Sequence, residues 1–306
     1  MIPQSIHDLD EQLTARNYIA DHGLVTAIFL SLKLNKPLFL EGEAGVGKTE
    51  IAKVLADVLD TELIRLQCYE GLDINHAVYE WNYARQLLEL RAHDSGGVTS
   101  AHTHPNIFSA EFLIKRPLLQ AIEDSRDNAP VLLIDEVDRS DTEFEAYLLE
   151  LLSDWQITIP ELGTLKAAHP PVVVITSNRT RELHDALKRR CIYYWIEYPN
   201  FQKELAIVRA KVPQAQVQLA AQVVAFIQEL RGRDLYKMPG VAETLDWASA
   251  LAALDQTALS EQIVNETLGV ILKYQDDVEQ VRGGIASELT ARAKDYQELG
   301  YERAAR

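Results

Sequence analysis

Cysteine is scarce in this 306-residue chain, which contains only Cys68 and Cys191. The two residues lie far apart in sequence and no C-x-x-C pair occurs, so we expect a reducing compartment and no zinc ribbon. No apolar run approaches the length that crosses a membrane. The amino terminus lacks a basic stretch followed by an apolar run, the pattern of a secretory signal. These absences predict a cytoplasmic protein without a membrane span.

Basic residues are also in deficit, because 30 Lys and Arg stand against 46 Asp and Glu, giving a net charge of −16. Binding to nucleic acid or to anionic membranes depends on clustered Lys and Arg. We therefore expect no nucleic-acid partner. The hydrophobic fraction of 47% is that of an ordinary globular protein, and the length allows one large or two moderate domains.

One segment matches the phosphate-loop pattern G-x-x-x-x-G-K-[ST] at every fixed position: Gly42, Glu43, Ala44, Gly45, Val46, Gly47, Lys48 and Thr49. An apolar run at 37–40 precedes it, and apolar residues at helical spacing follow it, so a chance glycine turn is the weaker alternative. Glycines let successive N–H groups approach and cradle phosphate oxygens. Lys48 would meet the β- and γ-phosphates, and the Thr49 hydroxyl would bind Mg²⁺. The segment predicts binding of a nucleoside triphosphate with Mg²⁺.

Polar residues that suit hydrolysis follow two later apolar runs. Asp135 would hold Mg²⁺, directly or through water, and Glu136 would orient and polarise the attacking water. Surface acids in a strand-end turn are the alternative. Asn178 would lie beside the γ-phosphate if the two strands are neighbours, although turn geometry also favours Asn at such a place.

Two adjacent arginines, Arg189 and Arg190, follow a helix-like stretch at 182–188. A guanidinium group can stabilise the charge on a transferring phosphoryl group, and a neighbouring subunit often supplies it. The alternative is a pair of solvated arginines at a helix end, where the helix dipole favours cations. Sequence spacing alone leaves both alternatives open.

Five short apolar runs alternate with helical patterns and predict an α/β fold of the P-loop type, with a parallel five-stranded sheet flanked by helices. They are residues 37–40, 63–66, 131–134, 172–176 and 192–196. Residues 156–166 predict a small hairpin. Helical spacing from Ala77 through Trp81 to Leu88 predicts one helix of about four turns. Residues 92–105 predict an exposed loop, in which solvated histidines are a better interpretation than a metal site.

After residue 200 only helical periodicity remains, so we expect a smaller helical domain there. The predicted division is an α/β domain at 1–200, with a helical insertion near 74–92, and a helical lid with a carboxyl-terminal tail at 201–306.

The phrases GEAGVGKTE, VLLIDEVDR, TSN and DALKRRC, in this order and followed by a helical region, resemble the MoxR branch of the AAA+ ATPases. Longer phrases, such as LSDWQITIPELGTL and PGVAETLDW, resemble its CoxD-like group, which is associated with aerobic carbon monoxide dehydrogenase gene clusters. The resemblance covers about residues 20–255.

This resemblance implies a homo-hexameric ring that hydrolyses ATP between subunits and acts as a chaperone on a metalloenzyme client. The client would be a molybdenum–copper carbon monoxide dehydrogenase or a related hydroxylase, and a protein with a von Willebrand A domain would be a partner. The resemblance assigns Walker A to residues 42–49, Walker B to Asp135 and Glu136, and sensor 1 to Asn178. Arg190 would be the arginine finger, with Arg189 as a second candidate.

The chain departs from that family at Thr244, which stands where a sensor 2 arginine is expected in a G-x-x-x-R context. Three other functions remain alternatives. A small-molecule kinase would use an acid near the acceptor and work as a monomer. A nucleic-acid motor would need basic strand-contacting loops, whereas residues 67–91 are mixed in charge. A nucleotide-switched scaffold without turnover would have no need of Glu136.

Overall fold

The computed structural model describes residues 3–95, 106–123 and 129–304, and the chain divides into two compact units. The first comprises Met1–Leu9, His22–Glu41 and Thr49–Trp195. The second comprises Asp10–Asp21, Gly42–Lys48 and Ile196–Arg306. Helix α1 (Ile6–Ala15) contributes residues to both.

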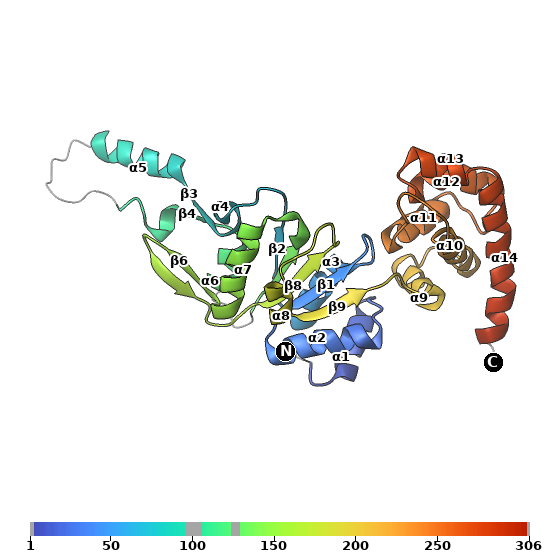
Figure 1. Ribbon diagram of the computed structural model, residues 1–306, viewed down its shortest axis with the longest axis horizontal. Coiled ribbons are helices and arrows are strands. Elements are labelled where there is room, and N and C mark those ends of the chain that lie inside the picture. Colours follow the sequence, from blue (N-terminus) through green and yellow to red (C-terminus); the bar gives the residue numbers. More distant parts are fainter. Residues whose placement is uncertain (1–2, 96–105, 124–128, 305–306) are drawn as a thin grey trace. The chain divides into compact units, whose positions relative to one another are not determined.

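The central sheet of the first unit has five strands in the order β2-β5-β8-β1-β9 (Figure 1). They are β1 (Leu38–Gly42), β2 (Leu63–Gln67), β5 (Val131–Asp135), β8 (Val172–Ser177) and β9 (Ile192–Ile196). The ladders that join β1 to β8, β8 to β5 and β5 to β2 are all parallel. The predicted α/β fold with a parallel five-stranded sheet is therefore confirmed.

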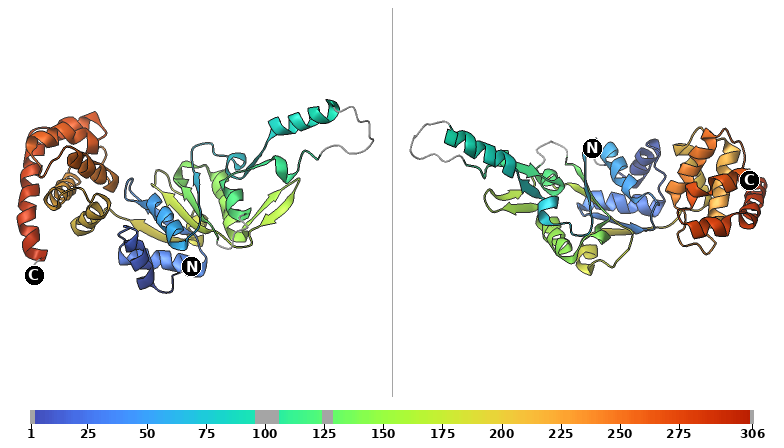
Figure 2. Two further views of the ribbon diagram at one scale, coloured as in Figure 1. Left: turned by 180° about the vertical axis from the view of Figure 1, so that it is seen from behind. Right: turned by 90° about the horizontal axis from the view of Figure 1, so that it is seen from above.

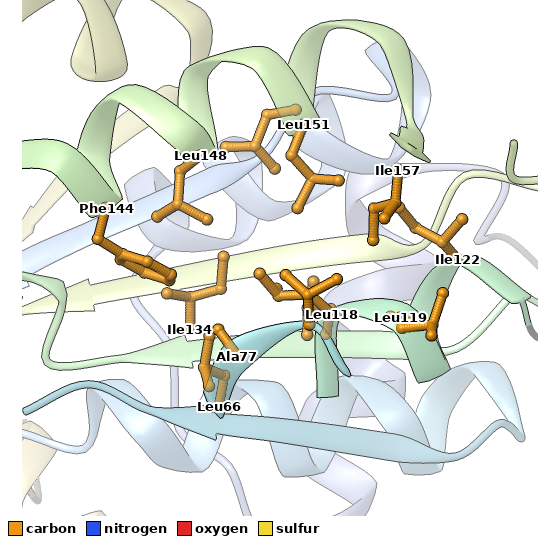
Figure 3. Close-up of a cluster of buried hydrophobic side chains, with 14 of the residues drawn as sticks. Leu66, Ala77, Leu118, Leu119, Ile122, Ile134, Phe144, Leu148, Leu151 and Ile157 are labelled. Atoms are coloured by element: carbon orange, nitrogen blue, oxygen red, sulfur yellow. The ribbon is translucent and has the colours of Figure 1, made fainter. Parts of the chain in front are cut away.

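The inner strands β1, β5 and β8 are buried on both faces, which is why they consist of nearly continuous apolar residues. Successive side chains of a strand point to opposite faces. In β5, Leu132 and Ile134 join a core cluster with helix α7 (Thr142–Asp154), whereas Leu133, on the opposite face, is also fully buried. Figure 3 shows Leu148 of α7 among the side chains that lie over Ile134.

Further helices and a hairpin complete the first unit. The helices are α2 (His22–Leu34), α3 (Lys48–Leu59), α6 (Pro117–Glu123) and α8 (Asp185–Arg190), with short 3-10 turns η1 (Ala110–Phe112) and η2 (Val137–Arg139). The hairpin predicted at 156–166 is confirmed, because β6 (Gln156–Ile159) pairs antiparallel with β7 (Gly163–Lys166).

The prediction of one continuous helix from Ala77 to Leu88 is wrong. The segment contains α4 (Ile74–Ala77), β3 (Tyr79–Trp81) and α5 (Tyr83–Ser95), and β3 pairs antiparallel with β4 (Leu113–Lys115) (Figure 2). The Trp81 ring is buried and meets the Phe108 ring edge to face, with 5.3 Å between centroids. Pairing with residues distant in sequence fixes Trp81 in a strand, and local spacing cannot report such a contact.

The loop predicted at 92–105 begins later than expected, because α5 continues to Ser95. Residues 96–105, which include His102 and His104, lie outside the described residues. No helix within the described ranges has the length and apolar character needed to cross a membrane.

The second unit has a helical core. Its helices are α9 (Phe201–Lys211), α10 (Val217–Leu230), α11 (Val241–Ala253), α12 (Glu261–Ile271), α13 (Gln275–Val281) and α14 (Gly284–Ala304). Trp247 of α11 is fully buried, packs on Phe226 of α10 and donates its indole N–H to the Thr267 hydroxyl at 2.8 Å. The predicted helical character after residue 200 is confirmed, whereas the predicted domain boundary stays a prediction.

The core cluster on the α7 face predicts a large cost for removing one buried leucine. Leu148 is fully buried, so Leu148→Ala should lower the free energy of unfolding by about 3–5 kcal/mol through lost burial and a residual cavity. Leu88→Ala makes the same chemical change at a side chain that is 66% exposed, and should cost less than about 0.5 kcal/mol. Urea unfolding of both variants measures the difference, and equal costs would contradict the assignment of Leu148 to the core.

Candidate nucleotide-binding site

The phosphate-loop segment connects β1 to α3 with a backbone that only glycine accommodates easily. Gly47 has φ +91°, in the left-handed region that favours glycine. A Cβ atom on Gly42 would lie 2.3 Å from the Ile196 carbonyl oxygen, so a side chain is excluded there. Because α3 begins at Lys48, its first N–H groups have no acceptor within the helix. This backbone therefore fits the phosphate cradle that the sequence predicts.

Lys48 is 6% exposed and is directed at the loop that precedes it. Its Nζ donates to the carbonyl oxygens of Gly42 at 2.7 Å and Glu43 at 2.6 Å. These bonds place an ammonium group beside the loop backbone, where an anionic ligand would meet it.

Asp135 ends β5, and the residue is 2% exposed. Oδ1 accepts hydrogen bonds from the hydroxyls of Thr49 at 3.0 Å and Thr176 at 2.6 Å. The structure thus brings together Thr49 and Asp135, the two residues predicted to bind Mg²⁺. Their hydroxyl and carboxylate oxygens are ligands of the type that this ion prefers, so the donor set fits Mg²⁺.

Glu136 has a strained backbone and a well-fixed side chain. Its φ of 55° and ψ of 50° lie in the left-handed region, where strain of order 1 kcal/mol is common at functional sites. Oε1 accepts from the Asn178 amide at 3.2 Å, and Oε2 accepts from the Gln67 amide at 3.1 Å. Arg139 Nε lies 3.0 Å from Oε2. Glu136 and Asn178, predicted from separate motifs, therefore lie in contact, and their catalytic roles remain predictions.

Asp138 fixes the turn that carries Asn178. Its buried carboxylate accepts from the Asn178 N–H at 3.2 Å, the Thr180 N–H at 2.9 Å and the Thr180 hydroxyl at 2.7 Å. Burial alone would raise the pKa of Asp138, but the hydrogen bonds from Thr180 and Asn178 stabilise its charged form, and the net effect lowers the pKa below 3.8.

Several residues that the sequence did not single out hold Asp135 and Glu136: Arg65, Gln67, Arg139 and Thr176. Asp138, which holds Asn178, was not singled out either. A signal was available for Gln67, which ends the strand β2 with a polar side chain. The register pairs Gln67 with Asp135, but the sequence does not disclose that β2 and β5 are neighbours. Once that order is known, polar residues at adjacent strand ends become expected members of the site.

Arg189 and Arg190 end α8, apart from these acids. Arg190 Nε donates to the Ser153 hydroxyl of α7 at 3.0 Å. Arg189 lies 3.9 Å from Asp185, and its side chain is 82% exposed. The hydrogen bonds and ion pairs formed among the described residues link neither arginine to Glu136, so the arginine-finger role stays a prediction.

Within the second unit, Thr244 closes a buried polar network. Its hydroxyl donates to Glu204 Oε1 at 2.7 Å, and Arg231 Nη1 lies 2.7 Å from Glu204 Oε2. A long cationic side chain in place of Thr244 would disrupt these bonds. In the same unit, the N–H groups of Val241 and Ala242 at the start of α11 donate to the Gly45 carbonyl at 3.0 and 3.2 Å. The chain therefore has a backbone contact to the glycine loop near the expected sensor 2 position.

Within the described residues, no other metal site is equally clear. The parts of the chain that the structure describes hold no group of three or more His, Cys, Asp or Glu side chains placed to bind an ion. Cys68 is buried and Cys191 is partly buried, and burial raises the pKa of each thiol to about 12. Both thiols therefore stay protonated at neutral pH.

A phosphate loop after one parallel strand, with Asp135, Glu136 and Asn178 after two others, defines the P-loop class of nucleotide-binding proteins. A comparison of the sequence with known protein families identifies the family within this class. Residues 37–191, about half of the chain, match the AAA domain of the dynein-related subfamily, and the chain belongs to this family of AAA+ ATPases.

The chain is similar to two uncharacterized staphylococcal proteins. It is 26% identical over 260 residues to one from Staphylococcus epidermidis and 25% identical over 259 residues to one from Staphylococcus aureus. Each match spans 81% of this chain and 88% of the relative.

Two solved structures are similar to this chain, at a lower sequence identity than the staphylococcal proteins. A point mutant of Thermotoga maritima RuvB matches 90% of this chain and 72% of its own, with a TM-score of 0.47 and 16% identity. A Cytophaga hutchinsonii protein, provisionally described as an ATPase, matches 90% of this chain and 84% of its own, with a TM-score of 0.47 and 15% identity.

The hydrogen bonds of Asp138 predict a pH-dependent stabilisation. Asp138→Asn should lower the free energy of unfolding at pH 7 by about 1–3 kcal/mol, because buried donors lose a charged acceptor. The pKa of Asp138 in the folded chain is below 3.8, so its contribution is complete above that pH and is lost as the pH falls through the folded value. Urea unfolding between pH 3 and 8 should therefore show the gap between wild type and variant narrowing below about pH 4.

The matched control is Asp246→Asn, which makes the same change at an exposed side chain of the second unit. We expect no comparable loss at pH 7. A gap for Asp138→Asn that persists unchanged down to pH 3 would contradict a stabilising charge at this position.

Proposed function

We propose that this chain is a Mg²⁺-dependent ATPase of the MoxR type, which assembles as a homo-hexameric ring and remodels a metalloenzyme client. The observation that carries the ATPase part is the placement of Glu136. Its carboxylate is held between Asn178 and Gln67, beside the contact of Thr49 with Asp135. A carboxylate fixed beside a Mg²⁺-binding pair suits the orientation of an attacking water.

The residues divide the work of hydrolysis. The loop N–H groups and Lys48 would hold the phosphates, and Thr49 and Asp135 would hold Mg²⁺, which when bound polarises phosphoryl oxygens. Glu136 would orient a water toward the γ-phosphorus. The water oxygen would form a bond to phosphorus as the bond to the leaving ADP breaks, giving ADP and inorganic phosphate, with the proton of the water released to solvent. Asn178 would keep Glu136 and the γ-phosphate in register.

The exposed arginines at the end of α8 support the proposed ring. Arg190 is exposed at the end of α8, and its described hydrogen bonds are to Ser153 and to the Ala186 carbonyl. We propose that it serves the nucleotide of a neighbouring subunit, where a guanidinium would stabilise the charge on the transferring phosphoryl group.

The client and partner rest on the sequence phrases that resemble the CoxD-like group. We propose a molybdenum–copper carbon monoxide dehydrogenase or a related hydroxylase as the client, a von Willebrand A domain protein as the partner, and the cytoplasm as the location. The acidic balance of the chain, 46 Asp and Glu against 30 Lys and Arg, favours a protein client over a nucleic acid. Adjacent genes for the dehydrogenase and the partner would support this part of the proposal.

Nucleotide binding and turnover should separate in two variants. Lys48→Ala should abolish tight binding, because a buried cation beside the phosphate loop is lost. Glu136→Gln should retain ATP and lower turnover by about 10²–10⁴-fold, because the binding contacts survive while the attacking water is no longer polarised by a carboxylate. Binding of a fluorescent ATP analogue and release of phosphate measure the two effects.

Matched controls for these variants lie on α3, where Lys53 and Glu50 form a partly exposed ion pair. Lys53→Ala and Glu50→Gln make the same chemical changes and should leave binding and turnover near the wild-type values. Equal loss of ATP binding in Lys48→Ala and Glu136→Gln would contradict the separate roles.

Shared active sites should be visible when two inactive chains are mixed. Arg190→Ala supplies an intact Glu136, and Glu136→Gln supplies an intact Arg190, so a mixed ring should regain ATPase activity. Arg189→Ala, mixed with Glu136→Gln in the same way, shows which of the two arginines serves the neighbouring subunit. The molecular mass in solution, measured with and without ATP and Mg²⁺, should increase when both are present, because they drive assembly of the ring.

Three outcomes would overturn parts of this proposal. A strictly additive result on mixing, or a monomer that hydrolyses ATP at full speed, would place all the chemistry within one chain. ATPase activity stimulated by DNA would favour a nucleic-acid motor over a protein-remodelling chaperone.

A further inference from the structure

The Asp135 carboxylate has no acceptor position left for a metal ion or for its water ligand. A carboxylate offers about four lone-pair positions. Oδ1 accepts from the hydroxyls of Thr49 and Thr176, and Oδ2 accepts from Arg65 Nε at 3.1 Å and Arg65 Nη2 at 2.6 Å. A cation that binds Asp135 must therefore displace at least one donor of the chain itself.

Two of the three donor residues are poorly suited to leave. Thr176 is 1% exposed, and its hydroxyl also accepts the Glu136 N–H at 2.9 Å, so its departure would disturb the backbone of Glu136. The Thr49 hydroxyl is itself a proposed ligand of the same ion. Its oxygen can bind the ion while its hydrogen still points to Asp135, so Thr49 need not leave.

Arg65 is free to move by comparison. It belongs to β2, which forms one edge of the sheet, and its side chain is 52% exposed, whereas the Asp135 side chain is 3% exposed. A flexible side chain that already reaches solvent loses little when it leaves a carboxylate. Gln67 Oε1, which accepts from Arg65 Nη2 at 2.5 Å, is the other partner that would be released.

We propose that Arg65 is a positioning residue that neutralises Asp135 in the metal-free chain and is displaced into solvent when Mg²⁺ binds. This inference rests on the proposed function, because it concerns the same ion. A nearly buried carboxylate needs a counter-charge in both states. Because guanidinium and metal compete for one carboxylate, each must weaken the binding of the other by the same factor.

The experiment compares full-length wild type with Arg65→Gln and Arg65→Lys. Each protein receives a non-hydrolysable ATP analogue and increasing Mg²⁺, and calorimetry or fluorescence reports analogue binding. Arg65→Gln should lower the Mg²⁺ concentration for half-maximal binding by about three- to tenfold, because the competing cation is gone. Arg65→Lys keeps the charge but loses the two-pronged contact, so it should lie between wild type and Arg65→Gln.

Metal-free stability supplies a second readout that does not depend on activity. Without Mg²⁺, Arg65→Gln should melt below wild type, and this loss should disappear in an Asp135→Asn background, where no charge needs neutralising. The matched control is Arg85→Gln. Arg85 is 51% exposed and also pairs with a carboxylate, that of Glu111, so its loss should leave the Mg²⁺ requirement unchanged.

The outcomes separate the two proposals. If Mg²⁺ strengthens analogue binding in wild type but the requirement in Arg65→Gln is unchanged or higher, the exchange at Asp135 is overturned while the proposed ATPase stands. If Mg²⁺ has no effect on wild type, the Mg²⁺-dependent function itself is overturned, and the exchange with it.

Discussion

The hydroxyl of Thr176 links the two acidic residues on which the candidate site depends. It donates to the Asp135 carboxylate at 2.6 Å and accepts the Glu136 N–H at 2.9 Å. This double contact exists because β5 and β8 are parallel neighbours whose register sets Ile134 beside Ile175. The next residues of the two strands, Asp135 in β5 and Thr176 in β8, then lie side by side at the carboxyl ends of the strands. A shift of register by one residue would turn these side chains to opposite faces.

The local sequence was sufficient to predict the buried strands and the glycine loop, because composition and backbone conformation determine these parts of the fold. Strands buried on both faces must be apolar throughout, so β5 and β8 were predictable from their composition. The glycines of the phosphate loop were predictable because few other residues accept the backbone that the cradle requires. Trp81 was misassigned because its strand is fixed by pairing with β4, from residues some thirty positions later. Arg65 was missed because strand order brings it to Asp135.

The second unit shows how one departure from a family pattern is absorbed. Thr244 lies in a network with Glu204 and Arg231, in which the Glu204 side chain is fully buried and that of Arg231 is 8% exposed. A charge pair at that depth tolerates little change, because removing one partner leaves the other uncompensated. Thr244 therefore helps to hold α9, α11 and the end of α10 together. The backbone at the start of α11 donates directly to the Gly45 carbonyl oxygen, a contact that does not depend on the side chain at position 244.

The backbone of Glu136 bears on how such a protein could lose its activity. Glycine, and to a lesser degree asparagine, adopt left-handed angles more readily than glutamate. Either substitution would relieve strain and, in one step, remove the carboxylate that we propose orients the water. The same substitution would also remove the contacts of the side chain with Asn178, Gln67 and Arg139, so the relief of backbone strain would be offset by lost hydrogen bonds.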